Sequence, residues 1–209
     1  MNQIGGNIYE GIKPSGAETI QGWNSNNPAF RELIEKKRPK VIIEVGTWLG
    51  ASAINMAAIC KELGLGTKIY CVDTWLGAEE FWTSMAGTQE RDLKQRNGYP
   101  TVYWDFLANV VEHGHKETIV PIPNTSRIGS LILQKNGILA DLVYIDGSHL
   151  YEDVKADIAS YKTLLAPEGV MFGDDIDWPS VRAAVSESFA NQHECRGPFW
   201  VSFDSRQGT

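Results

Sequence analysis

Two short apolar runs that end in acid constrain this chain of 209 residues more than any other feature. The first runs from Asp141 to Asp146 (DLVYID), and the second runs from Gly169 to Asp175 (GVMFGDD). Both are typical of buried parallel strands, which are continuously apolar. The segment between them is long enough for one helix, which is the usual connection between parallel neighbours. We therefore expect the acidic ends to lie roughly 5 Å apart at one edge of a sheet.

The rest of the chain alternates between strand-like and helix-like segments in the same way. Predicted strands cover residues 40–45, 68–73, 118–122, 141–146, 169–174 and 197–204. Predicted helices cover residues 28–37, 50–63, 99–113, 126–136, 150–164 and 178–191. This alternation predicts an α/β fold with a Rossmann-like, doubly wound sheet and helices on both faces. We expect the sheet to be mostly parallel, with an antiparallel last strand.

The start of the chain has a different composition from the remainder. Residues 1–27 are rich in Gly, Asn and Ser, which predicts an irregular arm before the first helix. We expect residues 1–39 to act as a lid or to contact the substrate. Residues 40–209 then form the Rossmann-like domain, and no linker or repeat divides them.

Charge and cysteine content exclude several classes of protein. The net charge is −7 and no block of Lys or Arg occurs, so binding to nucleic acid or to an anionic membrane is not expected. No apolar run is long enough to span a bilayer, and the first residues lack the pattern of a signal peptide. The three cysteines have no CxxC spacing, which predicts a reducing compartment, the cytoplasm, with neither disulfide nor zinc.

A loop of small residues follows the first predicted strand. It reads EVGTWLGAS from Glu44 to Ser52, and Gly46 and Gly50 allow the backbone to approach a ligand closely. The spacing is not GxGxxG, so a dinucleotide fingerprint is absent, and a tight strand-to-helix turn explains the glycines equally well. Asp73 ends the second strand, where an acid can accept both hydroxyls of a ribose. Glu44 and Asp73 together predict an adenosine site without a pyrophosphate clamp.

Further candidates for this adenosine site follow the second and third strands. Asn124 and Ser126 lie where an adenine is expected, although Ser126 is as good a candidate for a helix N-cap. Trp75, Trp82 and Trp178 are candidates for a platform under the adenine or a sugar, with packing as the alternative. The predicted cofactor-binding residues are Glu44, Gly46, Thr47, Ser52, Asp73, Trp75, Asn124 and Ser126.

The acids at the later strand ends predict a different kind of site. Asp146, Asp174 and Asp175 would repel one another unless a cation joins them, and a hard cation with oxygen ligands is the natural partner. His149 lies three residues beyond Asp146, on the same loop or first helical turn. The alternative is that these acids only cap the helices that follow them.

Four segments, EVGTWLGAS, YCVDTW, DLVYIDGSHLYEDVKADI and GVMFGDD, resemble class I S-adenosylmethionine-dependent methyltransferases. More narrowly, they resemble the metal-dependent sugar O-methyltransferases of macrolide and aminocoumarin biosynthesis, over roughly residues 40–190. The resemblance implies that Asp146, Asp174 and Asp175 bind Mg²⁺ or another divalent cation such as Mn²⁺. It also implies that His149 is the base, which acts with Asp146 in catalysis. Two departures are Asp174, where some relatives have Glu, and the lack of their extra N-terminal domain.

The expected reaction is therefore methyl transfer from S-adenosylmethionine to a hydroxyl of a sugar. A deoxyhexose such as rhamnose, free, nucleotide-linked or in a glycan, is the leading acceptor, and a catechol or other small diol is the alternative. A non-catalytic adenosine-binding module and a nicotinamide oxidoreductase fit less well, because the acids and His149 are intact and the pyrophosphate loop is missing. The protein is also expected to form a homo-oligomer or to be one module of a longer glycan-modifying enzyme.

Overall fold

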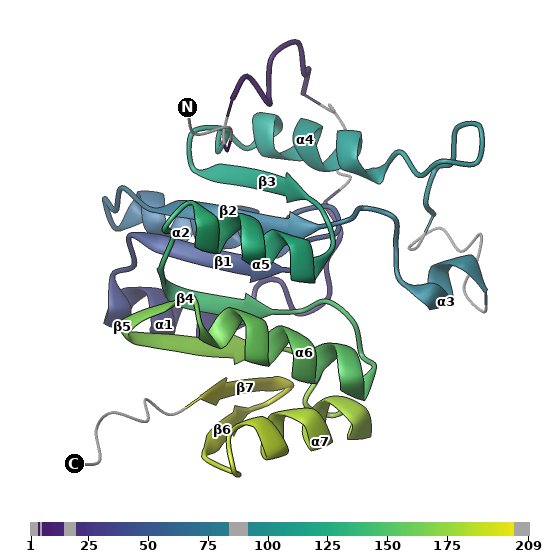
Figure 1. Cartoon of the computed structure of the whole chain (residues 1–209). Coiled ribbons are helices and arrows are strands. Elements are labelled where there is room, and N and C mark those ends of the chain that lie inside the picture. Colours follow the sequence, from purple (N-terminus) through teal and green to yellow (C-terminus); the bar gives the residue numbers. More distant parts are fainter. Residues whose placement is uncertain (1–3, 5, 15–19, 84–91, 203–209) are drawn as a thin grey trace.

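The computed structural model describes residues 4, 6–14, 20–83 and 92–202. Within this part of the chain, a seven-stranded sheet has the order β3-β2-β1-β4-β5-β7-β6 (Figure 1). Strands β1 to β5 pair in parallel, whereas β7 is antiparallel to both β5 and β6. The predicted fold class is thus confirmed. The strands are β1 Val41–Val45, β2 Lys68–Asp73, β3 Ile119–Pro123, β4 Ala140–Ile145, β5 Leu165–Gly173, β6 His193–Arg196 and β7 Phe199–Ser202.

Helices cover both faces of this sheet (Figure 1). One apolar core joins the sheet to α1, α2 and α4, and a second core joins it to α5, α6 and α7. The short helix α3 instead lies beyond the carboxyl ends of the strands. The helices are α1 Pro28–Lys37, α2 Ala51–Glu62, α3 Glu79–Trp82, α4 Val102–Glu112, α5 Ser126–Lys135, α6 Tyr151–Lys162 and α7 Pro179–Ser188.

The two cores follow from the alternation of side chains along each strand. In β1, Ile42 packs into the first core and its neighbour Ile43 packs into the second. The first core includes α1, whose Phe30 is fully buried and contacts the rings of Tyr144, Phe172 and Phe199 edge-on. The predicted N-terminal helix is therefore packed against the sheet of the main domain.

The last hairpin corrects one sequence prediction. The predicted helix over 178–191 ends at Ser188, and Ala190 and Asn191 take left-handed conformations that turn the chain into β6. The strand β6 has the sequence HECR, which lacks the apolar pattern of a buried strand because it forms the edge of the sheet. The structure confirms a strand within the predicted range 197–204, as far as Ser202. The rest of that range lies outside the described residues.

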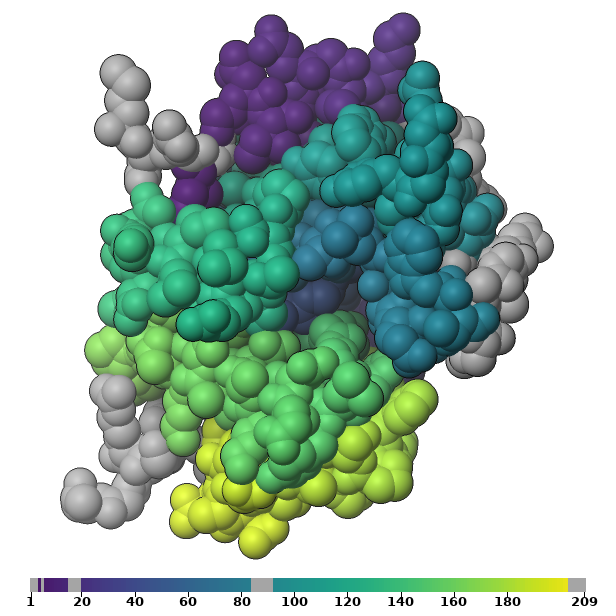
Figure 2. All heavy atoms as spheres, turned by 45° about the vertical axis from the view of Figure 1, so that its right-hand side comes forward, coloured from purple at the N-terminus to yellow at the C-terminus, as the bar shows by residue number. Residues whose placement is uncertain are grey.

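The parallel strands all end at one edge of the sheet, where ligands bind in doubly wound folds. Figure 2 turns this edge forward and shows a hollow in it, with blue atoms of the early strands at its base. A separate cavity of about 650 Å³ lies near the amino ends of β2 and β3, against residues 6–10. Within the described residues, every helix is too short or too polar to cross a lipid bilayer.

Candidate functional site

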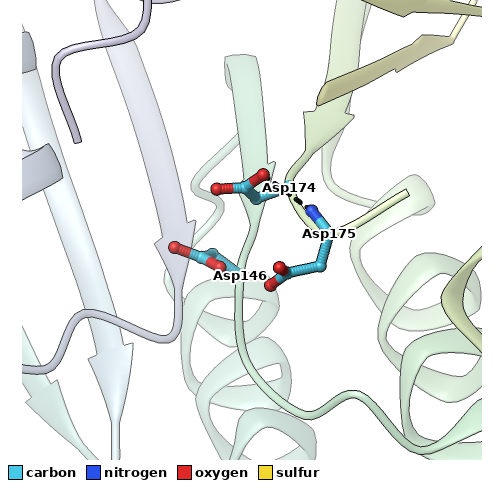
Figure 3. A group of neighbouring side chains, drawn as sticks. All are labelled: Asp146, Asp174 and Asp175. Atoms are coloured by element: carbon cyan, nitrogen blue, oxygen red, sulfur yellow. Dashed lines mark hydrogen bonds between the residues drawn. The ribbon is translucent and has the colours of Figure 1, made fainter. Parts of the chain in front are cut away.

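The three predicted metal ligands meet at the carboxyl ends of β4 and β5. Ile145 and Gly173 are register partners in these parallel strands, so the acids that follow them are neighbours. One carboxylate oxygen from each of Asp146, Asp174 and Asp175 lies within 4.8 Å of the others (Figure 3). The sequence prediction that these three side chains come together is therefore confirmed.

The backbone at Asp175 explains how two adjacent acids share one site. Successive side chains of an extended strand point to opposite faces, which would separate Asp174 from Asp175. Asp175 instead has φ of 62°, in the left-handed region that Asp tolerates better than most residues. The backbone N–H of Asp175 also donates to Asp174 Oδ1 at 2.7 Å, shown as the dashed line in Figure 3. The turn directs both carboxylates toward Asp146.

Asp146 and Asp174 are poorly solvated, and all three carboxylates repel one another. Burial, and then the charges of Asp174 and Asp175, raise the pKa of Asp146 well above its usual value. Asp174 is 4% exposed, and burial raises its pKa to about 6. Among the described residues, no lysine or arginine forms an ion pair with any of the three. A divalent cation with oxygen ligands fits this donor set, because it would supply the missing positive charge.

His149 stands beside the acids and is held on several sides. Its Nε2 lies 2.9 Å from Asp175 Oδ2, and its Nδ1 lies 3.7 Å from Glu80 Oε1. The hydrogen bond with Asp175 raises the pKa of His149, although burial acts in the opposite direction. The ring stacks on Trp178 with centroids 4.5 Å apart, and Ser180 Oγ donates to the His149 carbonyl at 2.6 Å. The imidazole is therefore fixed in place next to the acidic group.

On the other side of the edge, Asp73 joins two strand-end loops. Its Oδ2 accepts from the backbone N–H groups of Thr47 and Trp48 at 2.8 and 2.9 Å, and its Oδ1 accepts from the N–H of Trp75 at 2.8 Å. The Asp73 carbonyl accepts from the N–H of Asn124 at 2.9 Å. Asp73 thus organises the predicted adenosine site, and its contact with a ribose remains a prediction.

Glu44 lies beneath this loop and requires a correction. Its carboxylate is 0% exposed and accepts from Thr47 Oγ1 at 2.9 Å, from Ser52 Oγ and from Cys71 Sγ at 3.3 Å. Burial raises its pKa to about 7. The prediction that the Glu44 side chain binds the cofactor is therefore wrong, because no part of it reaches the surface. Its hydrogen bonds with Thr47 and Ser52 instead set the shape of the loop.

Gly46 connects the loop to the acidic group. Its φ is 83°, and a Cβ atom on it would lie 2.0 Å from the Asp146 carbonyl oxygen. Only glycine allows this approach. The N–H of Asp146 also donates to the carbonyl of Val45 at 2.8 Å. The predicted cofactor loop and the first acid are thus in direct backbone contact.

A family model described as a methyltransferase domain matches residues 43–176. The match covers more than half of the chain and includes the loop after β1, Asp73, all three acids and His149. The chain belongs to this methyltransferase family. This confirms the prediction of a class I S-adenosylmethionine-dependent methyltransferase.

One curated protein and several solved structures are similar to this chain. A Sinorhizobium fredii (strain NBRC 101917 / NGR234) protein, "Uncharacterized protein y4gI", is 25% identical over 190 residues that cover 85% of this chain and 19% of that protein. The apo structure of CalS11, described as a TDP-rhamnose 3'-O-methyltransferase of calicheamicin biosynthesis, is 18% identical, with a TM-score of 0.58 over 91% of this chain and 89% of that chain. An O-methyltransferase from Bacillus cereus in complex with SAH is 13% identical, with a TM-score of 0.61 over 88% and 82% of the two chains. At these identities, the solved structures show a shared fold.

The start of α5, which follows β3 in this methyltransferase, corrects one alternative for Ser126 and leaves the prediction for Asn124 unchanged. The N-cap of α5 is Thr125, whose Oγ1 accepts from the N–H of Ile128, so the alternative of Ser126 as the cap is wrong. Ser126 Oγ donates to Asp157 of α6, whose pKa burial raises to about 6. Asn124 Oδ1 accepts from the N–H of Thr125 at 3.1 Å, and its side-chain amide remains the better candidate for an adenine contact.

The tryptophans divide into packing and exposed groups. The Trp75 indole is 2% exposed, packs on Tyr103 and Phe106, and donates from Nε1 to the Trp48 carbonyl at 2.8 Å. Its side chain is therefore part of the core, and the prediction of a ligand platform is wrong for Trp75. Trp178 is 48% exposed and stacks on His149, so it remains a candidate platform.

Three residues near the acids were not predicted from the sequence. Tyr144 Oη donates to Asp146 Oδ2 at 3.0 Å, Asn24 Nδ2 donates to Asp174, and Glu80 faces His149. Tyr144 is indistinguishable from a core residue of its strand by pattern alone. Asn24 and Glu80 lie in segments without regular periodicity, so the sequence carries no signal for these contacts.

Proposed function

We propose that this protein is a divalent-metal-dependent O-methyltransferase that methylates a sugar hydroxyl, with S-adenosylmethionine as methyl donor. A deoxyhexose such as rhamnose, free, nucleotide-linked or in a glycan, is the proposed acceptor. The observation that carries the proposal is the group of three carboxylates within 4.8 Å, with His149 beside it. The description of CalS11 as a TDP-rhamnose 3'-O-methyltransferase supports the choice of a sugar.

The cation site would consist of Asp146, Asp174 and Asp175. A bound Mg²⁺ or Mn²⁺ would lower the pKa of an acceptor hydroxyl and help to fix its position. The chain prepares this site by holding the acids in place: Tyr144 donates to Asp146, and the N–H of Asp175 donates to Asp174. Two vicinal hydroxyls of a sugar have the spacing to chelate such an ion together.

The methyl donor would occupy the part of the edge that Gly46 and Asp73 shape. Asp73 is proposed to accept hydrogen bonds from the ribose, and Asn124 to contact the adenine. The complex of the Bacillus cereus O-methyltransferase with SAH supports such a ligand. Because the Gly46 loop touches the Asp146 carbonyl, the methyl donor and the acceptor hydroxyl would be brought close together, which methyl transfer requires.

His149 is the proposed general base. A sugar hydroxyl has a very high pKa, so a nearby group must take its proton as the new bond forms. The hydrogen bond with Asp175 stabilises the protonated imidazole and so raises the pKa of His149. The stack on Trp178 and the contact with Glu80 orient the ring. This arrangement resembles that of other histidine bases held by a carboxylate.

A catechol or another small diol is the second candidate acceptor. The exposed face of Trp178 beside His149 favours it, because an aromatic acceptor can stack there.

The chain spans about a fifth of the length of the Sinorhizobium fredii relative. This length supports the proposal that the domain is one module of a longer protein, and modification of glycans by that protein is part of the proposal for a sugar acceptor.

Incubation with a panel of acceptors tests the proposal. The protein, S-adenosylmethionine and Mg²⁺ would be mixed with sugars, nucleotide sugars and catechols, and the products analysed by mass spectrometry. We expect a mass gain of one methylene group on a sugar, loss of the product in EDTA and recovery when Mg²⁺ is restored. The Asp141→Asn variant, changed at the opposite end of β4, is the matched control for variants of the three proposed metal ligands. It should keep the activity of the wild type. Full activity in EDTA would contradict the metal dependence, and methylation of catechols alone would favour the second candidate.

A further inference from the structure

A turn in the N-terminal arm reaches one of the three acids. Asn24 Nδ2 lies 3.0 Å from Asp174 Oδ2 and 3.3 Å from Asp174 Oδ1, across 150 residues of sequence. Asn24 has φ of 50°, a left-handed conformation that asparagine adopts more readily than most residues. Its carbonyl accepts from the N–H of Asn27, the N-cap residue of α1, at 2.9 Å. The turn thus presents its amide to the acids while it leads into a helix.

Contacts with α2 set the position of this turn. Asn55 Nδ2 of α2 donates to the Ser25 carbonyl at 2.9 Å. A Cβ atom on Gly22 would lie 2.6 Å from the Cβ of Ala51, so the chain passes very close to the first turn of α2. Because α2 begins directly after the loop that contains Gly46, the arm is anchored to the cofactor side while Asn24 reaches the acids. The amide therefore has a defined place relative to both parts of the site.

The donors around Asp174 are both neutral. The amide of Asn24 and the N–H of Asp175 occupy its oxygens, and neither adds a positive charge. A lysine in place of Asn24 would compete with a cation for the carboxylate, whereas an amide fixes the orientation and leaves the charge available. Hydrogen bonds to metal-binding carboxylates act in this way in metalloproteins, by orienting the ligand.

We propose that Asn24 is a positioning residue for Asp174, and that it sets the affinity of the site for a divalent cation. This inference rests on the proposed metal-dependent function. It makes the N-terminal arm a working part of the site, since the arm supplies the side chain that orients one of the ligands. Asn24 itself touches neither the acceptor nor the methyl donor in this scheme.

The binding of Mn²⁺ to the purified protein tests the inference. Electron paramagnetic resonance measures the free Mn²⁺ and so gives the affinity. The Asn24→Gly variant removes the amide but keeps the left-handed turn. We expect it to weaken Mn²⁺ binding about tenfold, as loss of such a supporting hydrogen bond typically does. Its affinity for S-adenosylhomocysteine in the absence of metal should match that of the wild type. Asn26→Ala, an exposed position in the same turn, is the matched control and should bind both ligands like the wild type.

Each outcome separates the inference from the proposed function. If the wild type binds Mn²⁺ and Asn24→Gly binds it equally well, the positioning role is wrong while the metal site stands. If the wild type binds no Mn²⁺, both proposals are wrong. A loss of S-adenosylhomocysteine binding by Asn24→Gly would overturn the inference, because it would show a collapsed arm. Asn24→Gln retains an amide donor on a longer side chain, so it should recover part of the lost affinity; no recovery would contradict the role of the amide.

Discussion

The two halves of the carboxyl edge use acids in opposite ways. At the ends of β1 and β2, Glu44 and Asp73 are each surrounded by hydrogen-bond donors of their own chain. After β4 and β5, Asp146, Asp174 and Asp175 face one another, and the charges of Asp174 and Asp175 add to burial in raising the pKa of Asp146. The acids of the first half are held by neutral donors of the chain itself, whereas the second half has an excess of negative charge.

This difference shows why an acid at a strand end does not by itself indicate a ligand. Glu44 is the penultimate residue of β1, and Asp146 directly follows β4, so both acids lie near the end of a buried strand. Glu44 stabilises a loop, because its carboxylate accepts hydrogen bonds from Thr47, Ser52 and Cys71. Asp146 lies where two strands bring further acids together. Burial and the charges of these acids raise its pKa well above that of an isolated carboxyl group.

The largest effect is expected for Asp146→Asn. Removal of one proposed ligand should abolish tight Mg²⁺ binding and lower kcat by about 10³-fold, equivalent to several kcal/mol of transition-state stabilisation. The metal-free protein should melt at a higher temperature than the wild type, because one of three repelling charges is gone. Activity assays and calorimetry check both effects. Unchanged Mg²⁺ affinity in this variant would show that Asp146 is not a ligand, and the acidic half of the edge would then have no role in binding a cation.

His149→Ala should lower kcat by about 10²- to 10⁴-fold, the usual range for loss of a general base. The affinity for S-adenosylhomocysteine should remain unchanged, because the imidazole belongs to the acidic half of the edge. Steady-state kinetics and isothermal titration calorimetry measure the two quantities. Turnover close to that of the wild type would show that another group takes the proton.

We expect the free energy of unfolding to depend on pH through the buried carboxyl group of Glu44. Its pKa is raised by burial from 4.5 to about 7, so its contribution to stability is complete below pH 4.5 and is lost as the pH rises through about 7. The loss amounts to about 3 kcal/mol. Glu44→Gln cannot ionise, so its free energy of unfolding, measured by urea titration without metal, should fall less than that of the wild type between pH 4.5 and 8. The exposed change Glu35→Gln is the control, and equal slopes for Glu44→Gln and the wild type would contradict the buried ionisation.

Asp73→Asn should have a smaller and more selective effect. We expect the affinity for S-adenosylhomocysteine to fall about tenfold, the size of one or two lost hydrogen bonds to a charged group. Mn²⁺ affinity should stay within twofold, because Asp73 lies on the half of the edge that needs no cation. Calorimetry with each ligand measures this, with the exposed change Asp92→Asn as control. A larger loss of Mn²⁺ than of S-adenosylhomocysteine would reverse the assignment of the two halves.

Much of this arrangement could be predicted from the sequence. The apolar runs before Asp73, Asp146 and Asp174 predicted strands whose ends share one edge, and the structure confirms both the strands and the meeting of the last two ends. This succeeded because buried parallel strands have a strong local signal. The spacing of these runs is also enough to predict the doubly wound sheet.

Other features depended on contacts that no local pattern encodes. Asn24 meets Asp174 across 150 residues, from a turn with no periodicity. Whether Glu44 and Trp75 point to a ligand or into the core depends on their neighbours from other elements, and the structure gives both of them interior places. The strand β6 was missed because a polar edge strand lacks the apolar pattern of a buried one.

The most direct test of the acidic site is an anomalous difference map from crystals grown with Mn²⁺ and S-adenosylhomocysteine. We predict one strong peak bounded by carboxylate oxygens of Asp146, Asp174 and Asp175, with S-adenosylhomocysteine on the Gly46 side of it. A map with S-adenosylhomocysteine bound and no peak among the three carboxylates would contradict the metal site.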